Sequence, residues 1–472
     1  MDYINKITEA GFGENPLYPQ NDIGIARLFF DLHKGAVLYV SEAKSWYAYD
    51  GKRWDKDEGG FKTMELCKLF VQAFGEYAAI HHADEKEFLK WAGKLTARRN
   101  REGILRDAMS IAPVSIADFD KDLTLLNVLN GTLNLRTFAL QQQNPADMIT
   151  KLAPVRYDVK ARFPRWEQFI DEITCGNTEL AVYLQKAIGY ALTGLTEYEV
   201  FFILYGEKTR NGKTTLIETI ANILGDYTRN TQAQSLARRS IDGAAATPDM
   251  ARLKGARLVT VPEPEKGLEL NIALIKQLTG GDTYTARFLN ANPFEFKPEF
   301  KLFINTNHLP RTADDTVFAS GRVKIIPFDR QFTEQEQDKG LKKLFRRREN
   351  KSAILNWAVM GWRLVQEVGF DTPARVNEVI EAYRSEADLI GVFLAEYTGA
   401  EEKGRLSTSL LYSYYAQWAK DNGYRPLSNR PFVADLRRRY EIKPDCKKGN
   451  VIIGLKLTNS FDPCPDEKLP WD

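Results

Sequence analysis

The fold of this chain is decided by the stretch Phe201-Phe-Ile-Leu-Tyr205-Gly206-Glu-Lys-Thr-Arg-Asn-Gly212-Lys213-Thr214-Thr215. Its first five residues are strand formers, the loop that follows is bounded by glycines, and a segment with helical apolar spacing opens at Lys213. A strand, a glycine-bounded loop and a helix in this order make a cradle for phosphate groups. The sequence therefore predicts an α/β fold organised around a nucleotide-binding loop.

Each part of this loop has a role in binding ATP and Mg²⁺. The loop N–H groups and the exposed donors of the helix N-terminus face the phosphate oxygens, and Gly212 lets the backbone come close. Lys213 reaches the β- and γ-phosphates, and the Thr214 hydroxyl ligates Mg²⁺. The residues assigned to nucleotide binding are Gly206, Asn211, Gly212, Lys213, Thr214 and Thr215.

The loop departs from the usual spacing, which places four residues between the two glycines. Five residues lie between Gly206 and Gly212. The loop is therefore either one residue longer than usual or uses Glu207 where glycine is normal. A chance Gly-Lys-Thr in an ordinary loop is the alternative, and the correct order of strand, loop and helix argues against it.

Composition limits the classes of protein. At 472 residues with a hydrophobic share of 43%, the chain should fold into roughly two to four domains. The formal net charge is +2, so any contact with nucleic acid must come from local basic clusters. Four scattered cysteines and four histidines argue against a zinc site and a disulfide framework. The sequence has neither a basic-then-apolar leader nor a run long enough to cross a bilayer, so we expect a cytoplasmic protein without a membrane partner.

Residues 1–160 form a separate α+β region in this interpretation. The segments Ala36–Val40 and Trp46–Trp54 predict strands, and Asp50-Gly51 is a strong hairpin signal. A helical stretch rich in alternating charge follows, from about Thr63 to Met109.

Two charged runs in this region have competing interpretations. Arg98-Arg99-Asn-Arg101 can touch phosphate, but a solvated helix face is the commoner meaning of such a run. Asp118-Phe119-Asp120 is similar to the metal-binding carboxylate pair of a primase or polymerase. No further constellation of carboxylates or histidines accompanies it, so a turn that enters Leu125–Val128 is favoured.

Carboxylates follow a short strand downstream of the phosphate loop. The strand is Arg257-Leu-Val-Thr-Val261, and Glu263 and Glu265 come after it. Carboxylates just beyond a buried strand are placed to hold Mg²⁺ and to orient the attacking water. A charged turn is the alternative, but the position downstream of a phosphate loop favours catalysis by both residues, with Glu263 and Thr214 at the metal.

Two strand-like stretches flank an Asn-rich turn between Gly280 and Pro298, which predicts a hairpin. An arginine and an exposed aromatic residue near its tip suit a stacking, backbone-tracking contact to single-stranded nucleic acid. A merely structural hairpin is the alternative. The residues assigned to DNA binding here are Arg287, Phe288, Asn290 and Lys297.

Two further polar positions complete the set expected of a nucleotide-driven motor. The strand Lys301-Leu-Phe-Ile304 ends at Asn305-Thr306-Asn307, and an amide at the carboxyl end of a strand can position the attacking water. Spacing alone does not decide between Asn305 and Asn307. Arg322 precedes another β-run, and an arginine supplied in trans can stabilise the transferring phosphoryl charge.

The order of these motifs carries a resemblance. They are Gly206 to Gly-Lys-Thr214, Glu263-Pro-Glu265, Thr279-Gly-Gly-Asp282 with Ala286-Arg287, Thr306-Asn-His-Leu-Pro310 and Ser320-Gly-Arg-Val-Lys-Ile-Ile-Pro-Phe328. This order resembles the superfamily 3 helicases, and more narrowly the phage and plasmid primase-helicases related to the poxvirus primase-helicase. The resemblance covers most of the chain, including Asn127–Leu135 and Lys186–Gly194 ahead of the motor and Asn356–Trp362 and Leu410–Trp418 behind it.

The resemblance implies an AAA+-type P-loop ATPase core in a ring, usually hexameric, that couples ATP hydrolysis to 3′→5′ translocation on DNA. The resemblance places Asn307 at the position of the family's sensor residue and Arg322 at the position of its arginine finger. Ser320-Gly321 replaces the Trp-Arg often seen before the finger, and the longer loop leaves the role of residues 207–210 open. Longer members of the family carry a primase domain ahead of the helicase. This chain has too little sequence there and no matching carboxylate-histidine set, so we expect no priming activity.

Residues from Leu406 onward are typical of a winged-helix domain. Helices are expected over Leu410–Asp421 and Asn429–Tyr440, followed by a strand hairpin from Glu441 to Thr458. A basic helix and a basic wing suit a DNA contact. A solvated helix on a protein-docking domain is the alternative. The residues assigned to DNA binding here are Arg437, Arg438 and Lys447.

Two functions remain open. The first is an ATP-dependent DNA helicase for replication of a phage or other mobile element, with a single strand in a central channel, a forked duplex as substrate, and a replication initiator or primase as partner. The second is a DNA-binding initiator or regulator in which ATP only drives assembly. A small-molecule kinase is disfavoured because such enzymes lack the Gly-Gly-Asp hairpin and the trans arginine. The expected segments are an N-terminal α+β domain (1–160), a helical lead-in (161–200), the ATPase core (201–330), a helical segment (331–390) and the winged-helix domain (391–472).

Overall fold

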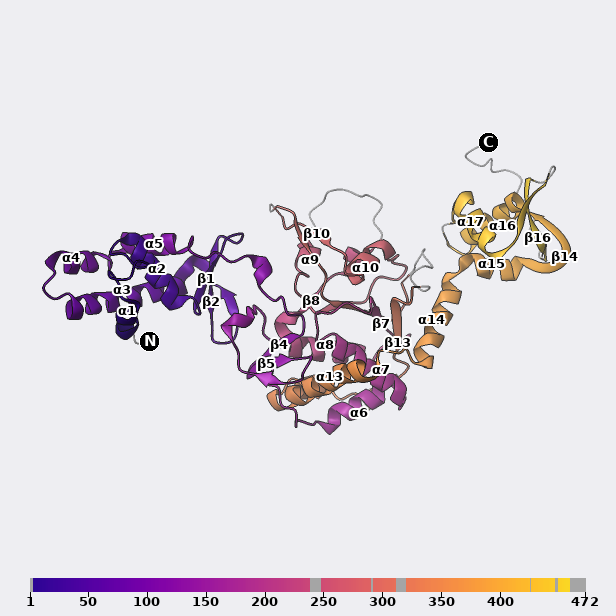
Figure 1. Ribbon diagram of the computed structural model, residues 1–472. Coiled ribbons are helices and arrows are strands. Elements are labelled where there is room, and N and C mark those ends of the chain that lie inside the picture. Colours follow the sequence, from indigo (N-terminus) through magenta and orange to yellow (C-terminus); the bar gives the residue numbers. More distant parts are fainter. Residues whose placement is uncertain are drawn as a thin grey trace. The chain divides into compact units, whose positions relative to one another are not determined.

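The structure is a computed structural model that describes residues 3–237, 248–289, 292–310, 320–424, 426–445 and 449–458. The chain divides into two compact units, one made of Met1–Pro310 with Gly321–Val376 and the other of Arg311–Ser320 with Asn377–Asp472. Each unit has its own apolar core, and Figure 1 labels the helices and strands.

The first unit begins with a helical subdomain that carries a small antiparallel sheet. Strand β2 turns into β3 at Asp50, whose carboxylate accepts hydrogen bonds of 2.8 Å from the N–H groups of Lys52 and Arg53. The hairpin predicted at Asp50-Gly51 is confirmed, and the predicted helical stretch divides into three helices. The elements are α1 (Tyr3–Ala10), α2 (Asp22–His33), β1 (Val37–Val40), β2 (Ser45–Tyr49), β3 (Trp54–Lys56), α3 (Phe61–His81), α4 (Lys86–Lys94) and α5 (Arg98–Ala108).

The two charged runs of this subdomain have structural roles. Arg98 opens α5 on an exposed face and donates to Glu102 one turn later, at 2.8 Å. The Asp118 carboxylate accepts a hydrogen bond of 2.9 Å from the N–H of Ser115, and that of Asp120 accepts one of 2.9 Å from the N–H of Thr150. The turn interpretation of both aspartates is therefore confirmed.

The core of the first unit is a five-stranded sheet in which every pair of neighbours is parallel. The strand order is β13-β7-β12-β9-β8, so β12 lies between β7 and β9. All but β8 are nearly continuous buried runs, the pattern of a parallel sheet whose faces are covered. The predicted α/β class is confirmed. The strands are β7 (Phe201–Tyr205), β8 (Thr228–Asn230), β9 (Leu258–Val261), β12 (Lys301–Thr306) and β13 (Val323–Pro327).

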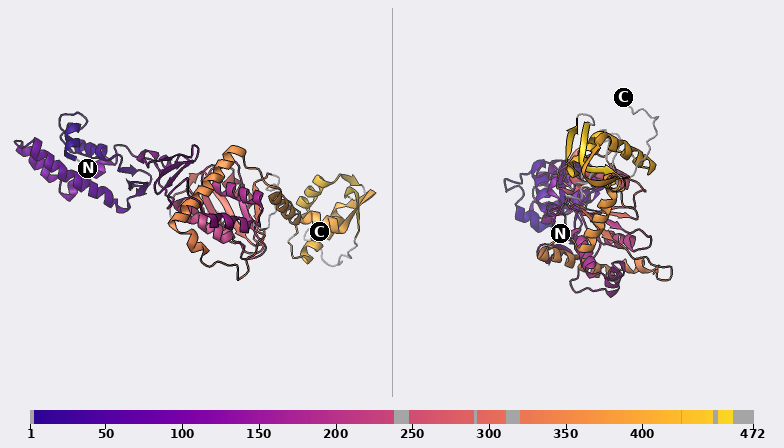
Figure 2. Two further views of the ribbon diagram at one scale, coloured as in Figure 1. Left: turned by 90° about the horizontal axis from the view of Figure 1, so that it is seen from below. Right: turned by 90° about the vertical axis from the view of Figure 1, so that its right-hand side faces the viewer.

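Helices pack on this sheet, and α6, α7 and α13, which lie below it in Figure 1, lie in front of it in the left view of Figure 2. Helix α7 lies alongside α13, as Figure 1 also shows. A further small sheet, β4-β5-β6, precedes α6 in the chain. The remaining elements of the unit are β4 (Leu125–Val128), β5 (Gly131–Asn134), β6 (Leu140–Gln141), α6 (Pro164–Ile173), α7 (Thr178–Tyr190), α8 (Lys213–Leu224), α9 (Pro248–Ala251), α10 (Ile272–Thr279), β10 (Tyr284–Ala286), β11 (Phe294–Phe296), α12 (Leu341–Phe345) and α13 (Arg348–Val368).

Two glycines let α7 and α13 approach at backbone distance, and this contact yields a stability prediction. A Cβ on Gly189 would overlap the backbone N of Trp362, and one on Gly361 would overlap the carbonyl oxygen of Gln185. We expect Gly189→Ala to lower the free energy of unfolding by about 2 kcal/mol, because overpacking outweighs the gain of about 1 kcal/mol in helix propensity. Urea denaturation measures this.

The matched control is Gly75→Ala in α3, where an added Cβ meets nothing within 4 Å. This variant should be as stable as the native chain or more stable by up to about 1 kcal/mol. Equal stability of the Gly189→Ala and Gly75→Ala proteins would contradict the close helix contact.

The second unit is a small α+β fold with a three-stranded antiparallel sheet in the order β14-β16-β15. The helices expected over 410–421 and from Asn429 are α16 and α17, and the expected hairpin is β15–β16. The apolar faces of α15, α16 and α17 meet the sheet around Phe393, Tyr415 and Phe432. No helix in the described ranges has an apolar run long enough to span a bilayer. The elements are α14 (Ala374–Ala387), within which the boundary between the units falls, α15 (Leu389–Tyr397), β14 (Thr398–Ser407), α16 (Thr408–Asp421), α17 (Asn429–Arg439), β15 (Ile442–Asp445) and β16 (Gly449–Leu457).

Candidate active site

The phosphate loop joins the end of β7 to the start of α8, as its sequence predicts. Gly212 has a φ of 88°, and a Cβ there would lie 2.5 Å from Ile173 Cγ2 of α6. A Cβ on Gly206 would lie 2.6 Å from the carbonyl oxygen of Phe328. Both positions therefore require glycine, for space and at Gly212 also for backbone conformation.

The extra residue of the loop is accommodated on its exposed side. Residues 207–210 are exposed, and Arg210 adopts a φ of 60°. Asn211 turns inward, is 4% exposed, and donates from Nδ2 to the carbonyl oxygen of Lys208 at 2.7 Å. The loop thus bulges outward before Asn211 and keeps Gly212 and Lys213 at the start of the helix.

The Lys213 ammonium is buried at the edge of the sheet. Its Nζ donates to the carbonyl oxygen of Gly206 at 3.1 Å and to Asn307 Oδ1 at 2.6 Å. Burial lowers the pKa of Lys213 to about 8, and the nearby Glu263 carboxylate opposes this shift. An incoming phosphate supplies the negative charge that favours the protonated lysine.

Asn307 links this lysine to the acidic residue. Its Nδ2 donates to Glu263 Oε2 at 3.2 Å, and its backbone N–H donates to Glu263 Oε1 at 3.1 Å. Lys213, Asn307 and Glu263 therefore form one chain of polar contacts. These residues follow β7, β12 and β9, whose carboxyl ends meet at the same edge because the strands are parallel.

Asn305, the next-to-last residue of β12, reaches the same site. Its Nδ2 donates to Thr214 Oγ1 at 3.2 Å. Its Oδ1 is buried and has no hydrogen-bond partner among the described residues. Both asparagines left open by the sequence are therefore at the site, with Asn307 between lysine and glutamate and Asn305 at the threonine hydroxyl.

These groups fit a magnesium-bound nucleoside triphosphate. The loop leads into the N-terminus of α8, whose first N–H groups are donors for phosphate oxygens, and Lys213 supplies a cation for the phosphates. The Thr214 hydroxyl and the Glu263 carboxylate are hard oxygen ligands of the type that Mg²⁺ prefers. The unpartnered Asn305 Oδ1 is an acceptor that a water molecule can satisfy there.

Two residues assigned to catalysis lie apart from this cluster. Glu265 is exposed and accepts a hydrogen bond of 3.4 Å from Gln234 Nε2. Arg322 lies at the opposite end of the sheet from the phosphate loop, since its carbonyl oxygen accepts from the N–H of Phe201, the first residue of β7. Its guanidinium pairs with Glu199 and donates to the carbonyl oxygen of Lys276 at 2.9 Å.

Thr215 is also assigned to nucleotide binding. Thr215 is half-buried in the first turn of α8, where its carbonyl oxygen accepts a hydrogen bond from Thr219.

Two neighbours of the loop were not predicted from the sequence. Phe169 and Ile173 of α6 pack against the Gly212 position. Their helical apolar spacing predicts the helix but carries no signal for the residue that it contacts.

The hairpin assigned to DNA binding is formed by β10 and β11 in antiparallel register. Phe288 is 41% exposed and stacks on Phe294, with ring centroids 5.6 Å apart. Arg287 is half-buried and Lys297 is exposed. Asn290 lies outside the described residues.

In the second unit, the arginines of α17 divide into two kinds. Arg437 and Arg438 are exposed, whereas Arg439 pairs with Asp388 at 2.6 Å and with Asp435 at 2.7 Å. Lys447 lies outside the described residues. Arg437 and Arg438 are therefore the two arginines in the last turn of this helix that form no ion pair with a described carboxylate.

Three protein families match successive parts of the chain. The family described as D5 N terminal like matches residues 26–175, a family of unknown function (DUF5906) matches residues 204–322, and the family described as poxvirus D5 protein-like matches residues 385–451. The expected resemblance to poxvirus-type proteins is confirmed for the first and last of these segments.

Two curated relatives extend this result. The protein named "Putative helicase L207/L206" of Acanthamoeba polyphaga mimivirus is 24% identical over 438 residues, which are 84% of this chain and 45% of that protein. The protein named "Putative helicase 022R" of Frog virus 3 (isolate Goorha) is 30% identical over 239 residues, which are 47% of this chain and 24% of that protein. The chain therefore spans less than half the length of either relative.

A solved structure shares the fold. The A form apo structure of the NrS-1 C-terminal region is 12% identical, with a TM-score of 0.50 over 92% of this chain and 100% of that one. At this identity the likeness concerns the fold alone. Taken with the family matches, the chain is similar over most of its length to viral proteins named as helicases.

Proposed function

We propose that this protein is an ATP-dependent DNA helicase that serves the replication of a virus, phage or other mobile element. The observation that carries the proposal is the polar chain of Lys213, Asn307 and Glu263 at the carboxyl ends of three parallel strands. The strand order β13-β7-β12-β9-β8, with the phosphate loop after β7, supports an AAA+-type P-loop core. The similarity to viral proteins named as helicases supports DNA as the substrate.

The residues of this chain bind and position the nucleotide in the proposed mechanism. Lys213 and the loop N–H groups hold the β- and γ-phosphates, and Thr214 and Glu263 would hold Mg²⁺, which would supply positive charge to the phosphates. Glu263 also orients the attacking water. Asn307, which bonds both Lys213 and Glu263, senses whether the γ-phosphate is present.

Assembly into a ring completes the proposed site. Within one chain Arg322 lies at the opposite end of the sheet from Lys213, so it cannot reach that chain's own nucleotide. Its role as an arginine finger therefore requires a neighbouring subunit, and the proposal is a ring, usually hexameric in such motors, that moves 3′→5′. The β10–β11 hairpin grips one DNA strand in the central channel.

From α15 onward the second unit has the order helix, strand, helix, helix and two strands, which supports a winged-helix domain. In such domains a helix enters the major groove and a strand hairpin contacts the backbone. Arg437 and Arg438 are then the DNA-facing cations of α17. Further partners in the proposal are a replication initiator or a primase.

The test of this function is ATP hydrolysis by native protein and by Glu263→Gln, each with and without single-stranded DNA. Native protein should hydrolyse ATP faster when DNA is added. Glu263→Gln should retain nucleotide binding, because the amide keeps its shape beside Asn307, but hydrolyse at least about 10²-fold more slowly, because the negative charge needed at metal and water is lost.

The matched control is Glu265→Gln, which removes the same charge two residues away from an exposed carboxylate. It should retain most of the native rate. Loss of nucleotide binding by Glu263→Gln would make Glu263 a structural residue, and equal rates for both variants would remove its catalytic role.

A further inference from the structure

A cavity of about 740 Å³ lies in the first unit, and none of its lining residues belongs to the active site. Its walls come from β2, the segment around Asp120, the segment at Lys151, β8, the end of α9 and the β10–β11 hairpin. Residues of the N-terminal subdomain and of the ATPase core thus line a single cavity.

The charge of this cavity is positive. Its lining includes four cations and two carboxylates, namely Lys151, Arg229, Arg252, Lys254, Asp120 and Glu299. No described carboxylate forms an ion pair with any of the four cations, whereas other exposed cations, such as Lys342 with Glu218, are paired. The Asp120 carboxylate is already bonded to Thr150.

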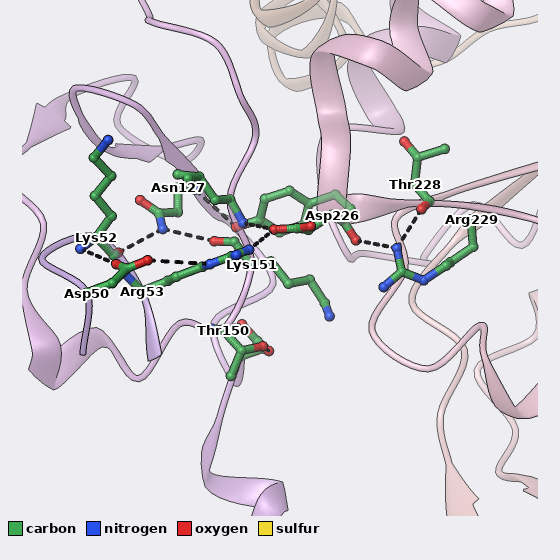
Figure 3. A network of polar contacts seen from close by, with 12 residues as sticks. Asp50, Lys52, Arg53, Asn127, Thr150, Lys151, Asp226, Thr228 and Arg229 are labelled. Atoms are coloured by element: carbon green, nitrogen blue, oxygen red, sulfur yellow. Dashed lines mark hydrogen bonds and ion pairs between the residues drawn. The ribbon is translucent and has the colours of Figure 1, made fainter. Parts of the chain in front are cut away.

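Lys151 is the most enclosed of the four cations. Burial lowers the pKa of its ammonium, although Asp120 opposes the shift. Its Nζ has no hydrogen-bond partner among the described residues, and its side chain extends away from the neighbouring polar contacts in Figure 3. Gly255 makes room for it, since a Cβ there would lie 2.8 Å from the Lys151 Cε. An anion in the cavity would satisfy this ammonium.

Two stacked aromatic pairs line the cavity. Tyr47 stacks on Phe119 with ring centroids 5.2 Å apart, and Phe288 stacks on Phe294 at 5.6 Å. The Lys254 ammonium lies over the Phe294 ring, 5.5 Å from its centroid. The cavity therefore combines aromatic rings with four cations that form no ion pair with a described carboxylate.

We infer that this cavity binds a short stretch of single-stranded DNA, with bases against the aromatic faces and phosphates against Arg229, Arg252 and Lys254. Single strands present a flat base and a phosphate at every step, and proteins bind them with this combination of stacking and positive charge. The inference deepens the proposed function, on which it rests for the choice of DNA. It gives the strand a second contact beyond the β10–β11 hairpin, on the N-terminal subdomain.

A free nucleotide is the competing ligand, because the volume suits a small molecule. A single phosphate group, however, needs donors that converge, such as a glycine-rich loop at a helix N-terminus. The cations here come from three separate segments, namely the segment at Lys151, β8 and the residues that follow α9. Their spread favours several phosphates along a strand.

A polar network holds the two walls in position (Figure 3). Asp226 pairs with Arg53 of the β2–β3 turn and accepts a hydrogen bond of 3.0 Å from the N–H of Leu152. Asn127 Nδ2 donates at 2.9 Å to the carbonyl oxygens of Lys52 and Lys151. The network joins the turn after β2, the segment at Lys151 and the turn before β8. The cavity is therefore formed before DNA arrives, which reduces the entropy that binding must overcome.

The test is fluorescence anisotropy of a labelled oligothymidylate of about 12 nucleotides, measured without ATP at several salt concentrations. The variant is Arg252→Gln with Lys254→Gln, which changes two exposed side chains of the cavity. We expect affinity at low salt to fall at least about 10-fold, and the slope of log K against log[salt] to become less steep by about 1.4, since each lost phosphate contact removes about 0.7.

The matched control is Lys90→Gln with Lys94→Gln, which removes the same charge from exposed positions of α4 that do not line the cavity. Its affinity should stay within about 2-fold of the native value, because distant exposed charges are screened. Tyr47→Leu should weaken binding about 5-fold or more through lost stacking, with an unchanged salt slope.

Three results would overturn the inference. The first is equal affinity and salt slope for the cavity variant and the control. The second is an unchanged affinity of the Tyr47→Leu protein, verified as folded by its circular dichroism. The third is displacement of the oligonucleotide by thymidine monophosphate at an equal concentration of nucleotide. A protein that binds DNA through the cavity but hydrolyses no ATP would support this inference and reject the helicase proposal.

Discussion

Lys213→Ala will hydrolyse ATP at least about 10²-fold more slowly than the native protein, the cost of removing one donor that stabilises developing negative charge. Lys213 is 4% exposed, and its ammonium donates to the carbonyl oxygen of Gly206 and to Asn307 Oδ1 beside the phosphate loop. Its role is to bring positive charge to phosphate, so the fold should survive the substitution. Steady-state hydrolysis and circular dichroism measure the two properties.

The matched control for this variant is Lys208→Ala. Lys208 lies in the same loop and carries the same charge, but it is exposed. It should retain most of the native rate. Equal rates for the two variants would show that the loop does not place Lys213 at the transferring phosphate.

Arg322→Ala will lower ATP turnover roughly 10³-fold, the effect of losing a transition-state arginine. The structure places this guanidinium beside Glu199 and the carbonyl oxygen of Lys276, at the end of the sheet that lies away from the phosphate loop. The expected loss must therefore arise at a neighbouring subunit's nucleotide. An arginine that only supported its own fold would change stability instead of turnover.

Mixing the two inactive proteins separates these roles. Arg322→Ala subunits retain the phosphate loop, and Lys213→Ala subunits retain the finger. Mixed rings should contain some interfaces with both groups intact, so activity should return in part as the ratio is varied. Mixed assemblies that form but show no activity at any ratio would contradict action in trans.

The sheet, and the edge of it that carries the site, can be predicted from the sequence because short segments of the chain indicate each strand and the polar residue that follows it. The strands β7, β9 and β12 are short apolar runs, and each is followed within a few residues by a polar group of the site. Parallel strands then bring those groups to one edge without further information. Glu263 and Lys213 are predictable in this way.

The contacts of the two asparagines could not be predicted from short segments of the sequence. Alternation along a strand would send Asn305 and Asn307 to the same face, but Asn307 lies beyond the last residue of β12, where the backbone is free to turn. Asn307 reaches Lys213 and Asn305 reaches Thr214, and only the folded chain decides this difference. The cavity could not be predicted from the sequence either, because its walls come from separate segments between Tyr47 and Glu299.

Strand displacement from forked duplexes that offer either a 3′ or a 5′ single-stranded arm measures whether ATP hydrolysis drives movement of this protein along DNA. We expect displacement by the native protein with ATP and Mg²⁺ on the fork with a 3′ arm, and none by Lys213→Ala or with a non-hydrolysable analogue. ATP hydrolysis stimulated by DNA without displacement of either fork would contradict a helicase and identify an initiator that uses ATP for assembly.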